Sequence, residues 1–280
     1  MNSKSGLMAG KRGLIMGVAN DRSIAWGIAK AVRDHGAELA FTFQGEALQK
    51  RVKPLADSLG STLVLPCEVT DDASLDATFD AVKKAWGGLD FVVHAIAFSD
   101  KEELKGKYVT TSRANFQQTL DVSCYSFTAV AERARHLMPN GGSLLTLSYV
   151  GAERVMPHYN VMGVAKAALE CSVRYLAADL GDQQIRVNAI SAGPIKTLAA
   201  SGIGDFRHIL RWNELNSPLG RNVSIEEVGG AGLYLLSDLS RGVTGELHHV
   251  DSGYNVVGMM RPDAAGELAE MLTSFAERKG

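Results

Sequence analysis

Short apolar runs alternate with amphipathic stretches along the first half of the chain, and this alternation predicts strands and helices in turn. Four runs have the length and β-branched content of buried strands, and they lie at 12–17, 38–43, 61–66 and 89–96. The stretches between them carry apolar residues at helical spacing, which predicts helices over 24–35, 45–59 and 73–86. Strand and helix in alternation are typical of right-handed βαβ units, which build a parallel sheet with helices on both faces.

The second half of the chain continues this alternation. It predicts helices over 113–138, 158–180 and 225–237, and strands over 142–148, 185–191 and 246–251. Ser224 and Glu227 have the spacing of a capping box ahead of the last of these helices. No Pro/Gly/Ser-rich linker divides the sequence, so we expect one domain over residues 1–280. The predicted fold class is α/β, a doubly wound sheet of seven parallel strands with helices on both faces.

Two segments interrupt the pattern where strands end. Residues 194–217 are too long for an ordinary connection and have weak helical character, and such insertions are usually lids or binding loops. Residues 98–112, after the fourth strand, are a second candidate for the rim of a site. Both segments follow the carboxyl ends of strands, where open α/β sheets bind their ligands.

Composition and charge narrow the class of protein. Apolar residues make up 46% of the chain and charged residues 21%, which is enough to bury a large core. The formal net charge of −2 gives little attraction to nucleic acid or to an anionic membrane, so we expect neither as a partner. The start of the sequence lacks the apolar stretch of a signal peptide, and no run of 18 apolar residues follows. We therefore expect a cytoplasmic protein.

The cysteines and histidines do not form a metal-binding pattern. Cys67, Cys124 and Cys171 are widely separated, with no Cys-x-x-Cys pair, so we interpret them as buried free thiols. His248 and His249 are neighbours in a predicted strand, which directs their side chains to opposite faces. We expect no metal held by the protein.

The turn after the first strand has features of a phosphate-binding turn. The stretch "MGVANDRSIAWG", residues 16–27, is not Gly-x-Gly-x-x-Gly, because Ser23 and Ile24 stand where a second glycine would let the backbone approach a pyrophosphate. The amides at the start of the helix, and Ser23 as its N-cap, nevertheless suit a pyrophosphate. We expect a Rossmann-type dinucleotide site with Gly17, Ser23 and Ile24 at the pyrophosphate; a purely structural turn is the alternative.

The ends of the next strands indicate how the rest of a dinucleotide would be held. Gln44 stands where an acidic residue would hold the adenosine ribose or a basic one a 2′-phosphate. Glutamine can bond a hydroxyl but offers a phosphate no charge, so we expect NADH rather than NADPH, although Lys50 and Arg51 lie nearby. Further expected contacts are Glu68 and Val69 at the adenine, Ile96 at the nicotinamide, and Ala97 and Ser99 beside it toward a substrate. His94 is interpreted as a packed strand residue rather than a base.

Two tyrosines and a lysine lie within residues 148–166. Tyr159 and Lys166 are seven positions apart, so at about 100° per residue their side chains leave a helix within about 20° of each other. Tyr149 ends the preceding strand and reaches the same cleft from another direction. One alternative is that both tyrosines are only packing residues, with their apolar rings buried and their hydroxyls hydrogen-bonded. Three polar groups that converge at a strand end favour a functional site.

With the segment "RVNAISAGPIKTLAASGI" at 186–203, these residues resemble the enoyl-acyl-carrier-protein reductases of bacterial fatty acid synthesis. This family is a divergent branch of the short-chain dehydrogenase/reductase superfamily, and the resemblance runs from residue 10 to about residue 260. Ordinary members of the superfamily space the tyrosine and lysine four apart and have a glycine-rich turn and an Asn-Asn-Ala-Gly strand end. Here the spacing is seven, with "GVANDRSIA" and "HAIA" in those places.

The resemblance implies a reaction and a role for each candidate residue. Tyr159 would hydrogen-bond the thioester carbonyl of a trans-2-enoyl chain while NADH delivers hydride to the β-carbon. Lys166 would hold the nicotinamide ribose and supply positive potential near the phenol. Tyr149 would either shape the substrate pocket or assist proton delivery. The other implied cofactor contacts are Ile195, Lys196, Thr197, Leu198 and Ala199, and residues 194–217 would form a lid over the acyl chain.

The resemblance also implies partners. Acyl carrier protein would dock on a basic patch made by Arg207, His208 and Arg211. A homotetramer with twofold symmetry is implied too, and the long predicted helices 113–138 and 158–180 are apolar on more than one side.

Three positions depart from the family pattern. Ala97 replaces a common glycine, Gly204 a frequent lysine of the basic patch, and Glu68 a common aspartate.

Three other classes of protein are less compatible with the sequence. A carbonyl-reducing dehydrogenase of the superfamily would need a tyrosine and a lysine four positions apart. A cofactor-binding regulator without turnover would be expected to lack the tyrosine or the lysine, and a hydrolase would need a Gly-x-Ser-x-Gly motif.

Overall fold

A parallel sheet of seven strands forms the centre of the computed structural model, which describes residues 6–198, 200 and 206–277. The strand order is β3-β2-β1-β4-β5-β6-β7, so the winding direction reverses between β1 and β4. The strands are β1 (Arg12–Met16), β2 (Glu38–Phe43), β3 (Leu63–Pro66), β4 (Phe91–His94), β5 (Gly142–Ser148), β6 (Ile185–Ala192) and β7 (Leu247–Val250). Every pairing in the sheet is parallel, which confirms the predicted fold class.

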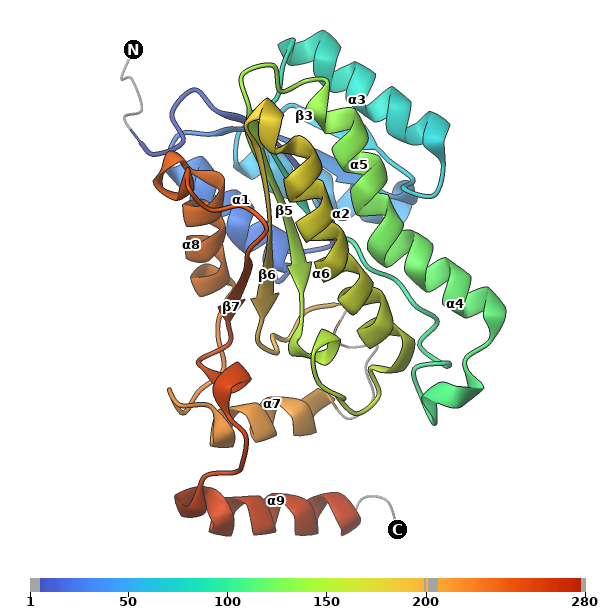
Figure 1. Ribbon diagram of the computed structural model, residues 1–280, viewed down its shortest axis with the longest axis vertical. Helices are drawn as coiled ribbons and strands as arrows, with labels where there is room; N and C mark the ends of the chain where they lie inside the picture. The colour runs from blue at the N-terminus through green and yellow to red at the C-terminus, as the bar shows by residue number, and fades with distance from the viewer. Residues whose placement is uncertain (1–5, 199, 201–205, 278–280) are drawn as a thin grey trace.

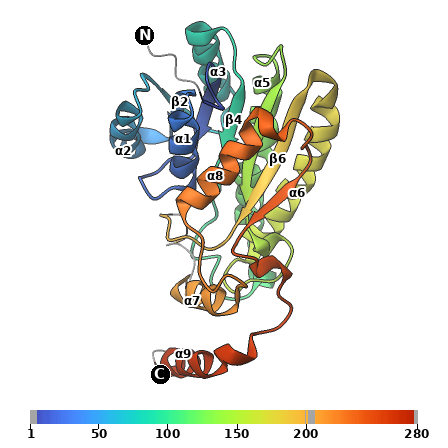
Figure 2. The same ribbon diagram turned by 90° about the vertical axis from the view of Figure 1, so that its left-hand side faces the viewer.

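Helices cover both faces of this sheet (Figures 1 and 2). They are α1 (Ile24–Asp34), α2 (Gly45–Ser58), α3 (Asp72–Trp86), α4 (Arg113–Leu120), α5 (Ser126–Arg135), α6 (Asn160–Leu180), α7 (Phe206–Asn216), α8 (Ile225–Leu236) and α9 (Ala265–Glu277). One apolar core joins the sheet to α3, α5 and α6, and a second joins it to α1, α2 and α8. Burial on both faces explains why the strands are nearly continuous apolar runs.

Residues 113–135 are helical throughout, which agrees with the long helix predicted near 113–138, but the helix contains a turn that the sequence did not predict. A π-helical segment, Asp121–Tyr125, separates α4 from α5. This wider turn directs Ser123 at the chain beyond β4, where its hydroxyl accepts from the Phe98 amide at 3.0 Å and donates to the Phe98 carbonyl at 3.1 Å. Such π-helical turns are frequent beside functional sites, and this one fixes the first part of the 98–112 segment.

The predicted weak helical character of residues 194–217 is wrong for their second half, which forms α7. The buried face of α7 contains Ile209 and Leu210 but also the asparagines 213 and 216, which hide the apolar period. Both asparagines are satisfied by hydrogen bonds: Asn213 donates to the Asn222 side chain at 3.0 Å, and Asn216 to the Trp212 carbonyl at 2.8 Å. Polar residues can occupy a helix's inner face when their hydrogen bonds are complete.

Helix α9 was not anticipated from the sequence, and it lies against α7 at one end of the molecule (Figure 1). Leu215, Ala264 and Leu268 form a small buried cluster there, with Trp212 and Met271 packed on it. Arg211 of α7 pairs with Glu267 of α9 and, at 3.0 Å, with Glu214. The end of the chain therefore supports the helix that belongs to the predicted lid.

Three smaller expectations can be compared with the structure. The capping box of Ser224 and Glu227 is present at the start of α8, as predicted. The three cysteines are free thiols, as predicted, but only Cys67 is fully buried. Within the described ranges, no helix is long and apolar enough to cross a membrane, and no three His, Cys, Asp or Glu residues gather as a metal site.

Candidate active site

The three polar residues predicted for catalysis come together beyond the carboxyl end of β5. Tyr149 directly follows β5, and its ring meets the ring of Tyr159 edge-on, with centroids 5.2 Å apart and planes at 72°. Lys166 lies two turns into α6, and its Nζ donates to the Leu147 carbonyl of β5 at 2.7 Å. Tyr159 and Lys166 are each 7% exposed. The structure thus brings both phenols and the ammonium to one strand end.

The chain takes an uncommon backbone path around Tyr159. Tyr159 is the N-cap residue of α6 rather than part of the helix, which begins two residues later than predicted. Its neighbours His158 and Asn160 both have positive φ, at 58° and 41°. Left-handed backbone is unfavourable for residues other than glycine, although asparagine tolerates it. The Asn160 amide donates to the Leu104 carbonyl at 3.0 Å, which ties the 98–112 segment to the start of α6.

Gly151 leaves space for the Tyr159 ring and Gly163 lets α6 approach Gly151 closely, and the sequence reasoning missed both glycines. A Cβ on Gly151 would lie 2.4 Å from Cδ1 of Tyr159, and one on Gly163 would lie 2.6 Å from the Gly151 carbonyl oxygen. Contacts below 3.0 Å are incompatible with an undisturbed ring. The only signal in the sequence was the position of these glycines, shortly after Tyr149 and shortly after Tyr159.

Burial determines the protonation states of the three groups. It raises the pKa of both phenols, and the neighbouring Tyr149 and Glu170 act on Tyr159 in the same direction. Burial lowers the pKa of Lys166 to about 8, against the opposing influence of Cys124 and Glu170. At neutral pH the two phenols are therefore neutral hydrogen-bond donors, and Lys166 is still mainly a cation.

The turn after β1 closes differently from the prediction. Gly17 has φ +94°, and a Cβ there would lie 2.0 Å from the Ala95 carbonyl oxygen beyond β4, so only glycine fits. Ser23 occupies the N-cap position of α1, but its side chain makes no capping bond, which corrects its predicted role. Its hydroxyl instead accepts from the amides of Ala19 and Asn20, at 3.0 and 3.1 Å. The Trp26 amide donates to the Ser23 carbonyl at 3.0 Å, so the amides of Ile24 and Ala25 are those of the first turn that point to an anion.

The residues predicted at the adenosine end contact each other. The amide of Gln44, just after β2, donates to the carboxylate of Glu68, just after β3. Burial acts to raise the pKa of Glu68, but hydrogen bonds from Gln44 and Thr70 outweigh it and hold that pKa below its ordinary value. Glu68 is therefore an anion beside Gln44. Val69 is buried in the core between the sheet and α3, α5 and α6.

The residues predicted on the nicotinamide side differ in burial and in hydrogen bonding. Ile96 is half-buried and Ala97 exposed, whereas the Ser99 hydroxyl is engaged with Asn115 and Thr119 at 3.0–3.3 Å. His94 is fully buried between Thr146 and Ser126, and burial lowers its pKa to about 3, so it is a neutral packed residue as interpreted.

The segment after β6 is described only in part. Ile195 packs against the core of α1, α2 and α8, Lys196 is exposed, and the Thr197 hydroxyl accepts from the Ala200 amide at 3.1 Å. Leu198 is exposed, while Ala199 and Gly204 lie outside the described residues. Arg207 is exposed near the start of α7.

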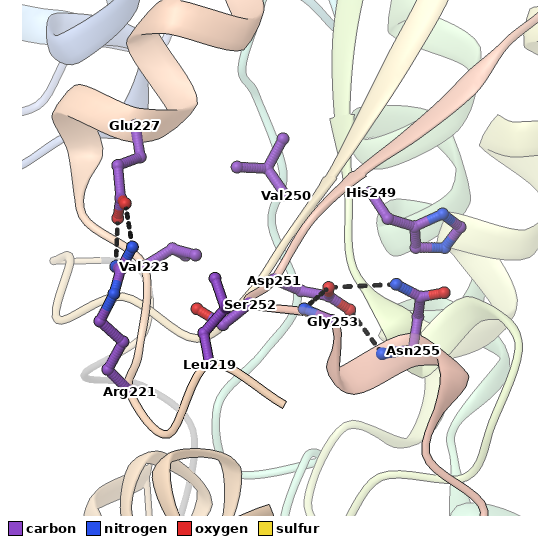
Figure 3. Close-up of a pocket in the computed structure, with 10 residues that line it drawn as sticks. All are labelled: Leu219, Arg221, Val223, Glu227, His249, Val250, Asp251, Ser252, Gly253 and Asn255. Carbon is purple, nitrogen blue, oxygen red and sulfur yellow. Dashed lines mark hydrogen bonds and ion pairs between the residues drawn. The ribbon is translucent and has the colours of Figure 1, made fainter. Parts of the chain in front are cut away.

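A separate cavity of about 290 Å³ lies beyond β7 and contains none of the predicted catalytic residues (Figure 3). Its charged groups are already paired: Arg221 holds Glu227 through contacts of 2.6 and 2.8 Å, and Asp251 accepts from the amides of Gly253 and Asn255 at 2.9 and 2.7 Å. These closed pairs leave the cavity without an evident reactive group.

Comparison with known proteins identifies the family. A family model described as "Enoyl-(Acyl carrier protein) reductase" matches residues 17–255. The chain belongs to this family. The chain is 70% identical over 264 residues to a Rhizobium meliloti protein named enoyl-[acyl-carrier-protein] reductase [NADH] 1, covering 94% of this chain and 97% of that one.

Solved enoyl reductases have the same fold. The Anaplasma phagocytophilum enoyl-(acyl-carrier-protein) reductase in complex with NAD matches with a TM-score of 0.89 and 65% identity, over 91% of this chain and 98% of that one. The Bacillus cereus enoyl-acyl carrier protein reductase with NADP+ and an indole naphthyridinone matches with a TM-score of 0.89 and 54% identity, over 91% and 100%. The sequence resemblance to this family is therefore confirmed.

Proposed function

We propose that this chain reduces the trans-2 carbon–carbon double bond of enoyl-acyl-carrier-protein thioesters with NADH, the last reductive step of the fatty acid elongation cycle. Relatives named as NADH-dependent enoyl-acyl-carrier-protein reductases are 54–70% identical over at least nine-tenths of this chain. The observation that carries the proposal is the neutral, buried phenol of Tyr159, edge-on to Tyr149 and on the same strand end as the Lys166 ammonium.

The carboxyl ends of the strands suit a nicotinamide dinucleotide. Gly17 and the amides of Ile24 and Ala25 would meet the pyrophosphate, and Lys166 Nζ, which donates to Leu147, has further donors for ribose hydroxyls. Gln44 donates its amide to Glu68, which leaves its carbonyl oxygen for the adenosine ribose. When bound, NADH supplies the hydride for the reaction. Ile96 and residues 195–199 complete the proposed cofactor contacts.

Tyr159 is the proposed donor to the substrate's thioester carbonyl. That oxygen gains negative charge as the β-carbon is reduced, so a donor placed there binds the transition state more tightly than the ground state. A raised pKa keeps the phenol protonated and able to donate. Tyr149 packs on the same ring and either shapes the acyl pocket or assists proton delivery. Ala97 and Ser99 remain proposed substrate contacts.

Acyl carrier protein is the proposed protein partner, with α7 at its docking surface. Of the three basic residues named from the sequence, Arg207 is exposed, and Arg211 already pairs with Glu214 and Glu267. We therefore assign the larger share of carrier-protein attraction to Arg207, with His208 beside it. Residues 194–217 form the proposed lid within a single domain over 1–280.

A homotetramer is the proposed assembly, and the cytoplasm the proposed location. Exposed large apolar side chains lie along α4, the π-helical segment and α6, namely Phe116, Tyr125, Val164 and Tyr175. Such a face on helices whose other sides cover the sheet is typical of a subunit contact. The free thiols of all three cysteines suit a reducing compartment.

One assay tests the reaction directly. Purified protein is mixed with NADH and crotonyl thioester, and separately with a panel of ketones, while NADH oxidation is followed. We expect oxidation with the enoyl thioester alone. Oxidation with ketones at comparable kcat/KM would instead indicate a carbonyl reductase, and none with any substrate would indicate a cofactor-binding protein without turnover.

A further inference from the structure

Glu170 is a buried carboxylate that no step of the proposed reaction uses. It lies on α6 four residues after Lys166, so both side chains leave the same face of the helix one turn apart. It is 8% exposed, although the side chain is acidic. Buried carboxylates are costly unless they are hydrogen-bonded or act on a nearby charge.

The contacts of Glu170 and Lys166 hold the last two residues of β5. Ser148 donates its hydroxyl to the Glu170 carboxylate at 2.5 Å, while Lys166 Nζ donates to the carbonyl of Leu147 at 2.7 Å. The next residue in the chain is Tyr149. One face of α6 therefore fixes the strand end that presents one phenol of the site, and the same helix begins at the other phenol, Tyr159.

The charged and titratable groups around this pair come from several elements. Those acting on Lys166 are Glu170 of α6, Cys124 of the π-helical segment and the neutral His94 of β4. Those acting on Glu170 are Glu153 after β5, His249 of β7 and Arg174 of α6. Glu153 and His249 also bond each other at 2.9 Å, and in Figure 3 His249 lies apart from the Arg221–Glu227 pair.

The surrounding groups act in opposite directions on the pKa values of Glu170 and Lys166. Burial raises the pKa of Glu170, and the Ser148 hydrogen bond lowers it. Glu153 acts to raise that pKa, and His249 and Arg174 act to lower it. The ionised Glu170 in turn opposes the burial that lowers the pKa of Lys166. The Ser148 hydroxyl thus stabilises the charge that keeps Lys166 protonated.

We propose that Glu170 is a positioning residue, which with Ser148 fixes the end of β5 and keeps Lys166 cationic at this strand end. The inference rests on the proposed function for its meaning in catalysis, but the coupling between Glu170 and Lys166 exists in the protein alone. The simpler alternative is that the Ser148–Glu170 hydrogen bond only holds β5 against α6. A purely structural bond would affect stability without changing the pKa of Lys166.

The test compares Glu170→Gln with wild type across pH 6–10. Glutamine keeps the size and an acceptor for Ser148 but removes the charge, so the pKa of Lys166 should fall. Because Lys166 is cationic only below its pKa, the loss of NADH binding that accompanies rising pH should then begin at a lower pH than in wild type. We expect the alkaline limb of the NADH dissociation constant, measured by fluorescence, to move about one pH unit toward acid. The alkaline limb of kcat/KM for crotonyl thioester should move with it.

Two further variants make the outcome decisive. Asp179→Asn removes an exposed charge from the same helix and should leave both limbs unchanged. Ser148→Ala keeps Glu170 but withdraws its donor, so it should shift the limbs in the same direction by a smaller amount. It decides the question if Glu170→Gln does not fold. The two effects should be less than additive when combined, because both act through one carboxylate.

The inference is overturned if the NADH-binding limb of Glu170→Gln superimposes on that of wild type. If only Ser148→Ala folds, its limb is compared instead. A lower melting temperature with an unchanged limb also overturns the inference, because a purely structural hydrogen bond predicts that pattern. If the wild type reduces no enoyl thioester but the binding limb still shifts, the proposed function fails and the coupling stands.

Discussion

The rings of Tyr159 and Tyr149 lie against each other beyond β5, yet the surroundings of the two phenols differ. Tyr159 is almost fully enclosed, stands between two residues with left-handed backbone, and has its ring against Gly151. Tyr149 continues directly from β5 and contributes its ring edge-on. A phenol held this rigidly has little freedom to follow a misplaced substrate, which is the condition for strong transition-state stabilisation.

We therefore expect Tyr159→Phe to slow hydride transfer by roughly 10²-fold or less, because a water or Tyr149 can replace part of one donor. Tyr149→Phe should leave NADH affinity intact and change mainly the handling of the acyl substrate. Lys166→Ala should weaken NADH binding and slow the reaction together. Single-turnover hydride transfer at saturating NADH separates the three variants. A much slower step for Tyr149→Phe than for Tyr159→Phe would mean that Tyr149 is the decisive phenol.

Gly151→Ala provides an independent test of the ring's position. The added methyl would lie 2.4 Å from the Tyr159 ring, so the ring must move, and a displacement of about 1 Å can cost about 10²-fold in rate. We expect kcat to fall 10- to 100-fold with NADH affinity unchanged. The control is Gly230→Ala on α8, where a Cβ meets nothing within 4 Å. Equal kcat values for the two variants would contradict the proposed role of the ring's position.

The cofactor preference is also decided by single residues. An ionised Glu68 beside Gln44 would repel a 2′-phosphate, so wild type should use NADH well ahead of NADPH. Glu68→Gln removes that charge and should raise the NADPH/NADH ratio of kcat/KM several-fold, chiefly through KM for NADPH. Gln44→Ala, which leaves the carboxylate, should weaken both cofactors more evenly. Comparable kcat/KM for both cofactors in wild type would refute the preference.

At the scale of elements, the sequence predicted the sheet well because its signal is strong. Buried parallel strands are nearly continuous apolar runs, and β2 and β5 begin and end where predicted. The π-helical turn within the helix at 113–138 was not predicted, because it does not interrupt the apolar pattern. Its Ser123 bonds Phe98, a long-range contact that local periodicity does not contain.

The residues of the candidate site were predicted to a similar degree as the elements of the fold, and the predictions that failed did so for similar reasons. Tyr149, Tyr159 and Lys166 stood out because they are chemically distinctive and regularly spaced. Ser23 carried a local N-cap signal, but its hydroxyl bonds the amides of the preceding turn instead. Glu170 carried no signal, and Gly151 only its position shortly after Tyr149, since their importance comes from contacts with side chains that only the fold brings near.

Helices α7 and α9 offer a test of what supports the lid. Leu268 of α9 is buried in the cluster with Leu215 and Ala264, whereas the Glu267–Arg211 ion pair is partly exposed. Losing a buried leucine costs about 2 kcal/mol or more, and losing an exposed ion pair at most about 1 kcal/mol. Leu268→Ala should therefore speed hydrogen exchange of residues 206–216 by about 30-fold, with Glu267→Gln changing it fivefold at most. The β5 amides should be unaffected in both variants.

Equal effects of these two substitutions would show that the ion pair supports α7 as much as the apolar cluster does. Binding of NAD+ with an acyl or aromatic ligand should slow exchange of the same residues if they belong to a lid. Equal exchange with and without ligand would argue against a lid at α7.

At the scale of the whole molecule, two faces of the sheet are covered but the outer surface of α4 and α6 is not. Figure 1 shows these helices together at one side of the sheet, and the π-helical segment between α4 and α5 contacts α6. Tyr125 on that segment is 57% exposed and Tyr175 on α6 is 71% exposed. Large aromatic side chains exposed at this level on adjoining helices favour burial against another subunit.

We expect the protein to form a homotetramer, which for four chains of 29.9 kDa has a mass of about 120 kDa (4 × 29.9) in light scattering. Tyr125→Glu combined with Tyr175→Glu places like charges against the twofold-related copy of the same surface, so the mass should fall to that of a dimer or monomer. Val109→Glu, an apolar-to-acidic change at a residue 83% exposed on the 98–112 segment, serves as the control and should remain tetrameric. A monomeric wild type in dilute solution would contradict the assembly, and a double variant that stays tetrameric would exclude the α4–α6 surface as its contact.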